Sequence, residues 1–222
     1  MISLGVIGNG VSVAFTDRFD EVGDDMGCAL FSQAATRRPT AIFAPNQVHG
    51  SKVLSPGFGH GDLAAGCDLD LGGEGDGIFL PAGSSVAGAV RTADCLPLVI
   101  SNRRGDVVIL HVGWRGLAAG IVENGISRLG ARGLHAVIGP HISDCCYEFR
   151  GPERYVVEKK VGLGAFREDK LSLDNGVRTI LYSFGMDRVE TIPVCTSCDS
   201  GFHSHRRDAD KGRQLTLAMA GS

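Results

Sequence analysis

Two apolar runs separated by a short polar turn place the strongest constraint on the fold of this chain. Residues 97–101 read PLVIS and residues 107–112 read VVILHV, and the five residues Asn-Arg-Arg-Gly-Asp join them. Such Val and Ile content is typical of β-strands, and so short a linker joins consecutive strands in an antiparallel hairpin. At least part of the sheet is therefore expected to be antiparallel.

The sequence also predicts further strands and several helices. Apolar runs that begin or end near Gly, Asn or Asp predict more strands at 11–15, 76–80, 85–91 and 134–138. Apolar residues at helical spacing predict helices at 24–37, 115–129, 152–161, 175–186 and 211–220. The expected fold class is mixed α/β (α+β), with a mixed, partly antiparallel β-sheet core flanked by helices.

Length and composition indicate one folding unit. A chain of 222 residues with 43% hydrophobic residues can bury one substantial core. Its 32 glycines show no period, so neither a repeat nor a low-complexity linker is indicated. Residues 1–222 are therefore expected to form a single domain.

Charge and cysteine content narrow the classes of partner. The formal net charge is −3 and, apart from short pairs, basic residues do not cluster, so the sequence points to a small molecule rather than to nucleic acid or a membrane. The N-terminus lacks the pattern of a secretory signal and no run has the length of a membrane helix, which predicts a cytoplasmic protein. Seven cysteines are expected to be mostly reduced, and the oligomeric state is left open.

Three metal-capable residues share one local pattern, because each stands at the edge of a β-like run beside small or turn residues. They are His49, Cys95 and His111. A catalytic zinc ion takes three protein ligands and keeps one open position, so these three residues are a candidate zinc site. Two alternatives remain. The residues can serve packing and local hydrogen bonds, or Cys95 can be a nucleophile with one histidine as its base.

Other candidate site residues neighbour these three. Asp94 precedes Cys95, and on a strand its side chain would point the opposite way, so it is expected either to orient a ligand or to act on substrate. Asp76 is similar, and for each carboxylate alone turn chemistry is the favoured explanation. Trp114 and Arg115 open the helix predicted at 115–129, where free N–H groups and a guanidinium suit a phosphate. The alternatives are a core tryptophan and a structural salt bridge.

The remaining cysteines and histidines carry weaker signals. Residues 195–198 form the only CxxC, which lacks the second half of a structural zinc site. The adjacent pair 145–146 is interpreted as packing. His203 and His205 would lie on one side of an extended segment and could bind a metal, although a surface loop is the favoured interpretation.

Six short blocks, in order, carry a family resemblance. They read NQVHGSKV, DGIFL, TADCLPLVI, HVGWRGLAAGIV, IGPHISDCCYEF and FHSHRRDADKGRQ, and they run from about residue 40 to residue 215. Together they resemble the blocks of the laccase-domain family, also called polyphenol-oxidase-like or purine nucleoside phosphorylase-like proteins. The chain is therefore identified as a member of this family.

The resemblance implies a specific chemistry. Members are zinc enzymes that cleave inosine, guanosine, adenosine or methylthioadenosine with phosphate, releasing the base, and that also deaminate adenosine. Their zinc ligands carry over to His49, Cys95 and His111. The stretch FTDRF is similar to the family's FSTR, which adds Arg18 to the expected pocket. Asp76, Asp94 and Arg115 are then expected to be catalytic, with Trp114 and Arg115 also binding substrate.

Departures from the family pattern leave the expected ligands in place. His141 and His205 stand where members commonly have Cys and Tyr, Val112 replaces a small residue, and the stretch RFDEVGDDMG replaces a glycine-rich segment.

Two rival functions remain. A multicopper phenol oxidase needs many more histidines than the seven present, and a non-catalytic zinc-binding or partner-binding protein would keep the metal without turnover.

Overall fold

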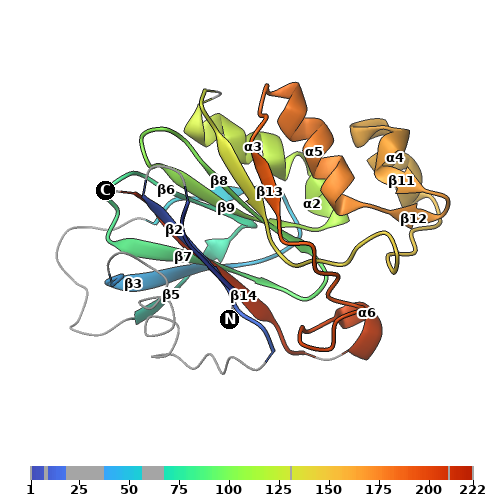
Figure 1. Ribbon diagram of the computed structural model, residues 1–222, viewed down its shortest axis with the longest axis horizontal. Coiled ribbons are helices and arrows are strands. Elements are labelled where there is room, and N and C mark those ends of the chain that lie inside the picture. Colours follow the sequence, from blue (N-terminus) through green and yellow to red (C-terminus); the bar gives the residue numbers. More distant parts are fainter. Residues whose placement is uncertain are drawn as a thin grey trace.

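Two β-sheets and a layer of helices lie face to face (Figure 1). The computed structural model describes residues 2–7, 10–18, 38–56, 68–130, 132–209 and 211–221. Its strands are β1 (Ile2–Ile7), β2 (Val11–Phe15), β3 (Ala41–Asn46), β4 (Val53–Leu54), β5 (Asp68–Glu74), β6 (Gly77–Leu80), β7 (Val86–Thr92), β8 (Leu96–Ser101), β9 (Val107–Val112), β10 (His135–Ile138), β11 (Phe166–Arg167), β12 (Lys170–Leu171), β13 (Val189–Thr191) and β14 (Gln214–Met219). Its helices are α2 (Trp114–Ala119), α3 (Ile121–Leu129), α4 (Glu153–Val161), η1 (Leu163–Ala165), α5 (Leu173–Ser183) and α6 (His205–Asp208).

Both large sheets mix parallel and antiparallel pairs. The first has the order β1-β2-β14-β7-β3-β5, in which β3 runs parallel to both β5 and β7. The second has the order β13-β10-β8-β9-β6-β4 and contains the hairpin of β8 and β9. The mixed, partly antiparallel sheet predicted from the sequence is therefore confirmed, although it is divided between two sheets.

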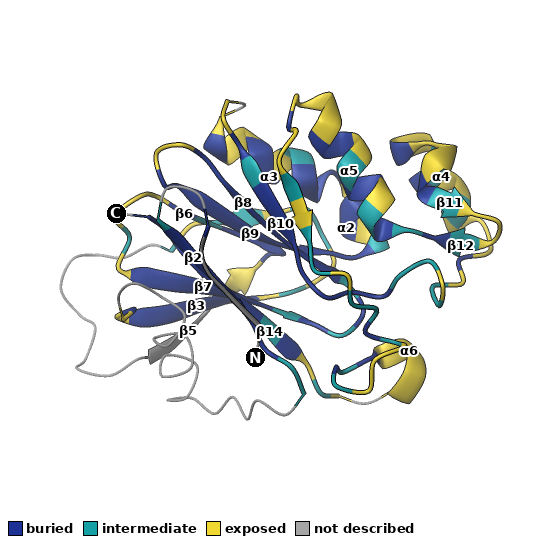
Figure 2. Ribbon diagram, viewed as in Figure 1, coloured by how far each residue is buried: buried dark blue, intermediate teal, exposed yellow. Residues whose placement is uncertain are grey.

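The alternation of side chains along β8 and β9 shows why the sheets stack. Leu98 and Leu110 point toward the helices, whereas Val99 and Ile109 point toward the first sheet. All four side chains are fully buried. Because successive strand residues face opposite sides, a strand that is apolar at every position fits only between two layers. Figure 2 shows this buried central sheet between the partly exposed helices and the first sheet.

The helical segment predicted at 115–129 is divided. Gly120 adopts a left-handed conformation, with φ of 89°, that ends α2 and begins α3. Glycine takes this conformation without the steric cost of a Cβ atom. The helices predicted at 152–161 and 175–186 correspond to α4 and α5.

The helix predicted at 211–220 is wrong, because residues 214–219 form β14. This strand lies between β2 and β7 and makes antiparallel pairs with both. The predicted helix at 24–37 lies outside the described residues. No helix in the described parts of the chain combines the length and the hydropathy that crossing a membrane requires.

Candidate active site

Three elements bring the predicted metal ligands together. His49 lies in the turn after β3, Cys95 lies in the bend between β7 and β8, and His111 lies on β9. Their ligand atoms all lie within 4.8 Å of one another. The two imidazole rings are 4.7 Å apart at an interplanar angle of 73°. Pairing of β8 with β9 places Pro97 opposite His111, so Cys95 and His111 lie side by side as the predicted strand pairing required.

Asp76 lies behind His111 and holds two parts of the site at once. Its Oδ1 accepts hydrogen bonds from the His111 Nδ1 at 2.8 Å and the His49 backbone N–H at 2.9 Å. Its Oδ2 accepts from the backbone N–H groups of Val48 and Gly50 at 3.2 and 2.6 Å. The carboxylate is fully buried. With its Nδ1 proton donated to Asp76, His111 presents Nε2 to the site.

The protonation equilibria of these groups are linked. Burial alone would raise the pKa of Cys95, but hydrogen bonds with His111 and His49 outweigh it and lower the pKa to about 6. Burial would lower the pKa of His111, but its bonds with Asp76 and Cys95 raise it to about 9. These values favour a Cys95 thiolate paired with a protonated His111, and the thiolate is the form that binds a metal or attacks as a nucleophile. A metal bound at His111 would displace the Nε2 proton.

Two glycines of the GWRG motif make room for this group. A Cβ atom on Gly113 would lie 3.1 Å from both the Cys95 Sγ and the His49 Cδ2. A Cβ atom on Gly116 would lie 2.9 Å from the backbone oxygen of Gly50, next to His49. Both contacts are tighter than ordinary van der Waals packing, so a side chain at Gly113 would press on two of the ligands and one at Gly116 would require the backbone next to His49 to move.

Asp94 occupies a turn rather than a strand. Its φ of 89° is rare for a residue with a side chain. Because the chain bends before β8 begins, the alternation of side chains along a strand does not apply to Asp94. Its Oδ1 accepts from the Thr196 hydroxyl at 2.8 Å and its Oδ2 from the Arg206 backbone N–H at 2.6 Å. Backbone strain of this kind is concentrated at functional sites.

A cavity of about 760 Å³ opens over the three ligands. This volume suits a small organic molecule. Among the described residues that line it, one is acidic, Asp94. Five are basic: Arg91, Arg115, Arg206, Lys211 and Arg213. The cavity is therefore positively charged and favours an anion.

The other sequence candidates are divided between the cavity and its surroundings. Trp114 and Arg115 line the cavity, with the guanidinium carbon 4.8 Å from the centre of the Trp114 ring. Among the described residues no carboxylate forms an ion pair with Arg115. Arg18 instead contacts the Ser200 carbonyl at 3.3 Å and the Asp208 carboxylate at 3.7 Å, so it holds the segment before α6.

Tyr147, His205 and three of the basic residues at 206–213 line the cavity but are not among the site residues predicted from the sequence, although they lie in the fifth and sixth blocks of the resemblance. Tyr147 lines the cavity, and the Arg206 guanidinium lies 5.2 Å from the centre of its ring. Of the histidine pair near the C-terminus, His205 lines the cavity, whereas the His203 backbone N–H donates to the Gln214 side chain. The basic residues at 206–213 lie far from the ligands in sequence, and only the fold brings them together.

The four cysteines at 145–146 and 195–198 form a second group whose sulfur atoms also lie within 4.8 Å of one another. The interpretation of residues 145–146 as packing is wrong, because Cys145 is exposed and Cys146 is only half-buried. The fold therefore places the adjacent pair next to the CxxC residues, and the four could hold a metal ion together.

Fold and site together define a two-sheet protein in which a candidate three-ligand metal centre faces a basic cavity. Residues 11–221 match the family model described as multi-copper polyphenol oxidoreductase laccase, and the chain belongs to this family. The family resemblance predicted from the six blocks is thus confirmed.

Related proteins support the same assignment. A Mycobacterium tuberculosis protein named purine nucleoside phosphorylase is 32% identical over 230 residues, covering 94% of this chain and 87% of the relative. A Deinococcus radiodurans protein of the same name is 32% identical over 178 residues, covering 74% and 64%. The crystal structure of Neisseria meningitidis NMB0706 matches with a TM-score of 0.77 at 25% identity and covers 99% of both chains. YlmD from Geobacillus stearothermophilus shares the fold, with a TM-score of 0.77 at 23% identity over 96% of this chain and 93% of its own.

Proposed function

We propose that the chain acts as one catalytic domain, a zinc-dependent purine nucleoside phosphorylase. It cleaves inosine, guanosine, adenosine or methylthioadenosine with phosphate to give the free base and a phosphorylated sugar, ribose 1-phosphate from the first three. One observation carries the proposal, namely a His, Cys, His group that opens onto a basic cavity large enough for a nucleoside. The names of the related proteins support the choice of substrate.

The donor atoms fit zinc. Two imidazole nitrogens and one thiolate are ligands that Zn²⁺ prefers, and three protein ligands leave one position open. Asp76 fixes His111 with Nε2 facing the site, which is the usual orientation of a zinc-bound histidine. When bound there, zinc supplies a Lewis acid that orients and polarises a substrate oxygen.

The basic wall of the cavity suits phosphate. Arg115 and Arg206 line the cavity near the candidate centre, and Lys211 and Arg213 add positive charge. Guanidinium groups bind phosphate oxygens through paired hydrogen bonds. Phosphate held in this way would attack C1′ of the ribose, so that a C1′–O bond forms while the C1′–N9 bond to the purine breaks.

The purine and ribose need apolar contact and polar partners. Trp114 and Tyr147 line the same cavity and offer aromatic surface to the base. Asp94 is mostly buried and lines the cavity. The remaining lone pairs of its carboxylate would accept a hydrogen bond from the nucleoside, or would take a proton from dihydrogen phosphate and pass it to the leaving base. Asp76 is a positioning residue in this proposal, because it acts through His111.

The test is phosphate-dependent release of base from inosine and adenosine by the purified protein, with zinc content measured in parallel. Base release is expected to require phosphate and to be lost, together with about one zinc ion per chain, in His111→Ala. His135→Ala is the matched control, because His135 of β10 pairs with Glu190 of β13 and neither residue is in the described cavity lining. Zinc binding without base release would contradict the proposal and favour a non-catalytic zinc protein.

Deamination of adenosine is proposed as a second activity of the same site. In this reaction water would attack C6 of the purine, so that a C6–O bond forms while the C6–N bond breaks and ammonia leaves. The same incubation without phosphate detects it as inosine formed from adenosine. Activity that survives a chelator but is lost on alkylation of Cys95 would instead favour the nucleophilic cysteine mechanism.

A further inference from the structure

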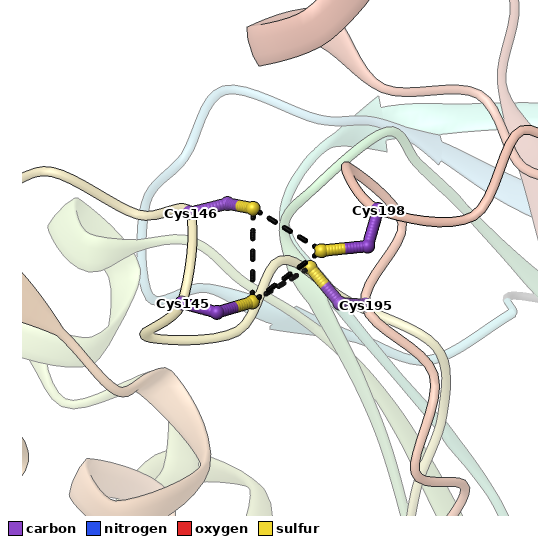
Figure 3. Close-up of side chains that lie close together, drawn as sticks. All are labelled: Cys145, Cys146, Cys195 and Cys198. Atoms are coloured by element: carbon purple, nitrogen blue, oxygen red, sulfur yellow. Dashed lines mark hydrogen bonds between the residues drawn. The ribbon is translucent and has the colours of Figure 1, made fainter.

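Four cysteine side chains converge between two loops (Figure 3), and none of the four is among the described residues that line the cavity. The Cys145 Sγ lies 3.6 Å from those of Cys146 and Cys195 and 3.5 Å from that of Cys198. The sulfur atoms of Cys146 and Cys198 are 3.3 Å apart. The two pairs are about fifty residues apart in sequence, so the fold creates this cluster.

Packing does not explain the cluster. Cys145 and Cys198 are exposed, and Cys146 and Cys195 are half-buried. Cysteines that serve packing are among the most buried residues of a protein, whereas these sulfur atoms face one another near the surface. All four are free thiols in this structure. Their convergence on one point therefore calls for a ligand.

The spacing of the sulfur atoms suits a single tetrahedral ion. Four thiolates at the usual Zn–S distance of about 2.3 Å stand about 3.8 Å from one another. The four measured separations, from 3.3 to 3.6 Å, are close to this value. The thiolates of a four-iron cluster each bind a different iron and stand further apart. We propose that Cys145, Cys146, Cys195 and Cys198 bind one structural zinc ion.

The surroundings of the cluster suit its negative charge. Four thiolates and one divalent cation leave net negative charge, which nearby donors stabilise. The Ser143 backbone N–H donates to the Cys195 Sγ at 3.4 Å. The ammonium group of Lys170 donates to the Cys145 carbonyl at 2.6 Å and so lies next to the cluster.

The ion would fasten two walls of the cavity. Cys146 is followed by Tyr147, which lines the cavity, and Cys195 is followed by Thr196, whose hydroxyl binds Asp94. A closed site with four protein ligands leaves no open position for substrate, so its role is structural. This second zinc does not depend on the function proposed for the cavity.

The first test combines zinc content with two variants of the full-length chain, each purified under reducing conditions without added metal. The wild-type protein is expected to hold about two zinc ions per chain. The double substitution Cys145→Ser, Cys198→Ser is expected to lose one of them and to keep the other. Cys95→Ala is the matched control and is expected to keep the zinc ion of the cysteine cluster.

A second measurement needs no substitution and covers the case in which the double variant fails to fold. Iodoacetamide is added to the wild-type protein with and without a zinc chelator, and the labelled cysteines are identified by mass spectrometry. All four cysteines are expected to be labelled far more slowly without the chelator.

The outcomes separate this proposal from the one for the cavity. A single zinc ion that is lost in the cysteine double variant but kept in Cys95→Ala would support this site and contradict the candidate centre. Unchanged zinc content in a folded double variant, or labelling that the chelator does not alter, would overturn the proposal. So would recovery of the four residues as two disulfides, or of iron with inorganic sulfide.

Discussion

Asp76→Asn tests whether the buried carboxylate organises the candidate metal centre. Each oxygen of Asp76 accepts two hydrogen bonds, one pair from His111 and His49 and the other from Val48 and Gly50. An asparagine keeps one acceptor oxygen and turns a donating NH₂ group toward the other pair. Two N–H groups then lose their acceptor, whichever way the amide is oriented.

The magnitude follows from these contacts. A donor left without an acceptor in a buried site costs about 1–3 kcal/mol, so the loss of two acceptors in Asp76→Asn is expected to lower the free energy of unfolding by about 2–6 kcal/mol. Loss of the carboxylate that orients a metal-binding histidine lowers metal affinity by about 10–100-fold. This corresponds to about 1.4–2.8 kcal/mol of binding free energy.

The assay is a zinc titration in competition with a chromophoric chelator, performed in a background in which Cys145 and Cys198 are serine so that one proposed site remains. Urea unfolding gives the stability of each variant. The matched control is Asp106→Asn, because Asp106 is also buried and accepts from the Ala82 backbone N–H and the Asn102 side chain in a turn outside the cavity lining. It is expected to lose stability and to keep zinc affinity.

Either of two results would refute the reasoning. If Asp76→Asn binds zinc as tightly as the parent, the carboxylate does not organise the ligands. If Asp106→Asn weakens zinc binding equally, the effect comes from general destabilisation rather than from the contact between Asp76 and His111.

Three further predictions concern the cavity and the hairpin. Gly113→Ala should lower zinc affinity at least tenfold, because its Cβ would press on two ligands, whereas Gly73→Ala, whose Cβ meets nothing within 4 Å, should leave the titration unchanged. Arg206→Ala should lower kcat/KM for phosphate by about 10–100-fold, as expected for a charged hydrogen bond of about 1.5–3 kcal/mol. Arg128→Ala removes a similar contact between a guanidinium group and an aromatic ring outside the cavity lining, and it should leave kcat/KM for phosphate unchanged. Equal losses in the two variants would argue against a phosphate site. Burial alone would raise the pKa of Asp106, but its hydrogen bonds lower it overall, so its stabilising effect is present above about pH 4 and is lost as the pH falls through the folded-state value. The difference in unfolding free energy between the wild type and Asp106→Asn should therefore shrink in acid, and a difference independent of pH would contradict this.

The sequence predicts strands well where burial on both faces leaves little choice of residue. β9 has the predicted bounds, because a run that is apolar at every position fits the central sheet. The apolar residues of the segment 211–220 fit both the helical period and the alternation of a strand, so the sequence pattern alone favours a helix wrongly. Pairing with β2 and β7, which are distant in sequence, decides in favour of a strand.

The candidate centre was predictable for a local reason. Each ligand stands at the edge of a strand or turn, and pairing of β8 with β9 brings Cys95 and His111 together. The basic wall was not predictable, since Arg206 and Lys211 reach the cavity only through the path of the chain around α6. The cysteine cluster is not predictable from the sequence. Adjacent residues on an extended chain point apart, whereas residues 144–146 form a turn.

Asp94 links the two proposed metal sites, and its contacts determine how one would affect the other. It precedes Cys95 in the chain, and its carboxylate binds both Thr196, next to Cys195, and the first turn of α6 at Arg206. Loss of the ion at the cysteine cluster would free the loop of Thr196 while Asp76 still held His49 and His111 from the opposite side. The effect on catalysis should therefore pass through the phosphate-binding wall rather than through the metal ligands. A weaker affinity for phosphate with the candidate centre still loaded is the pattern that this arrangement of contacts implies.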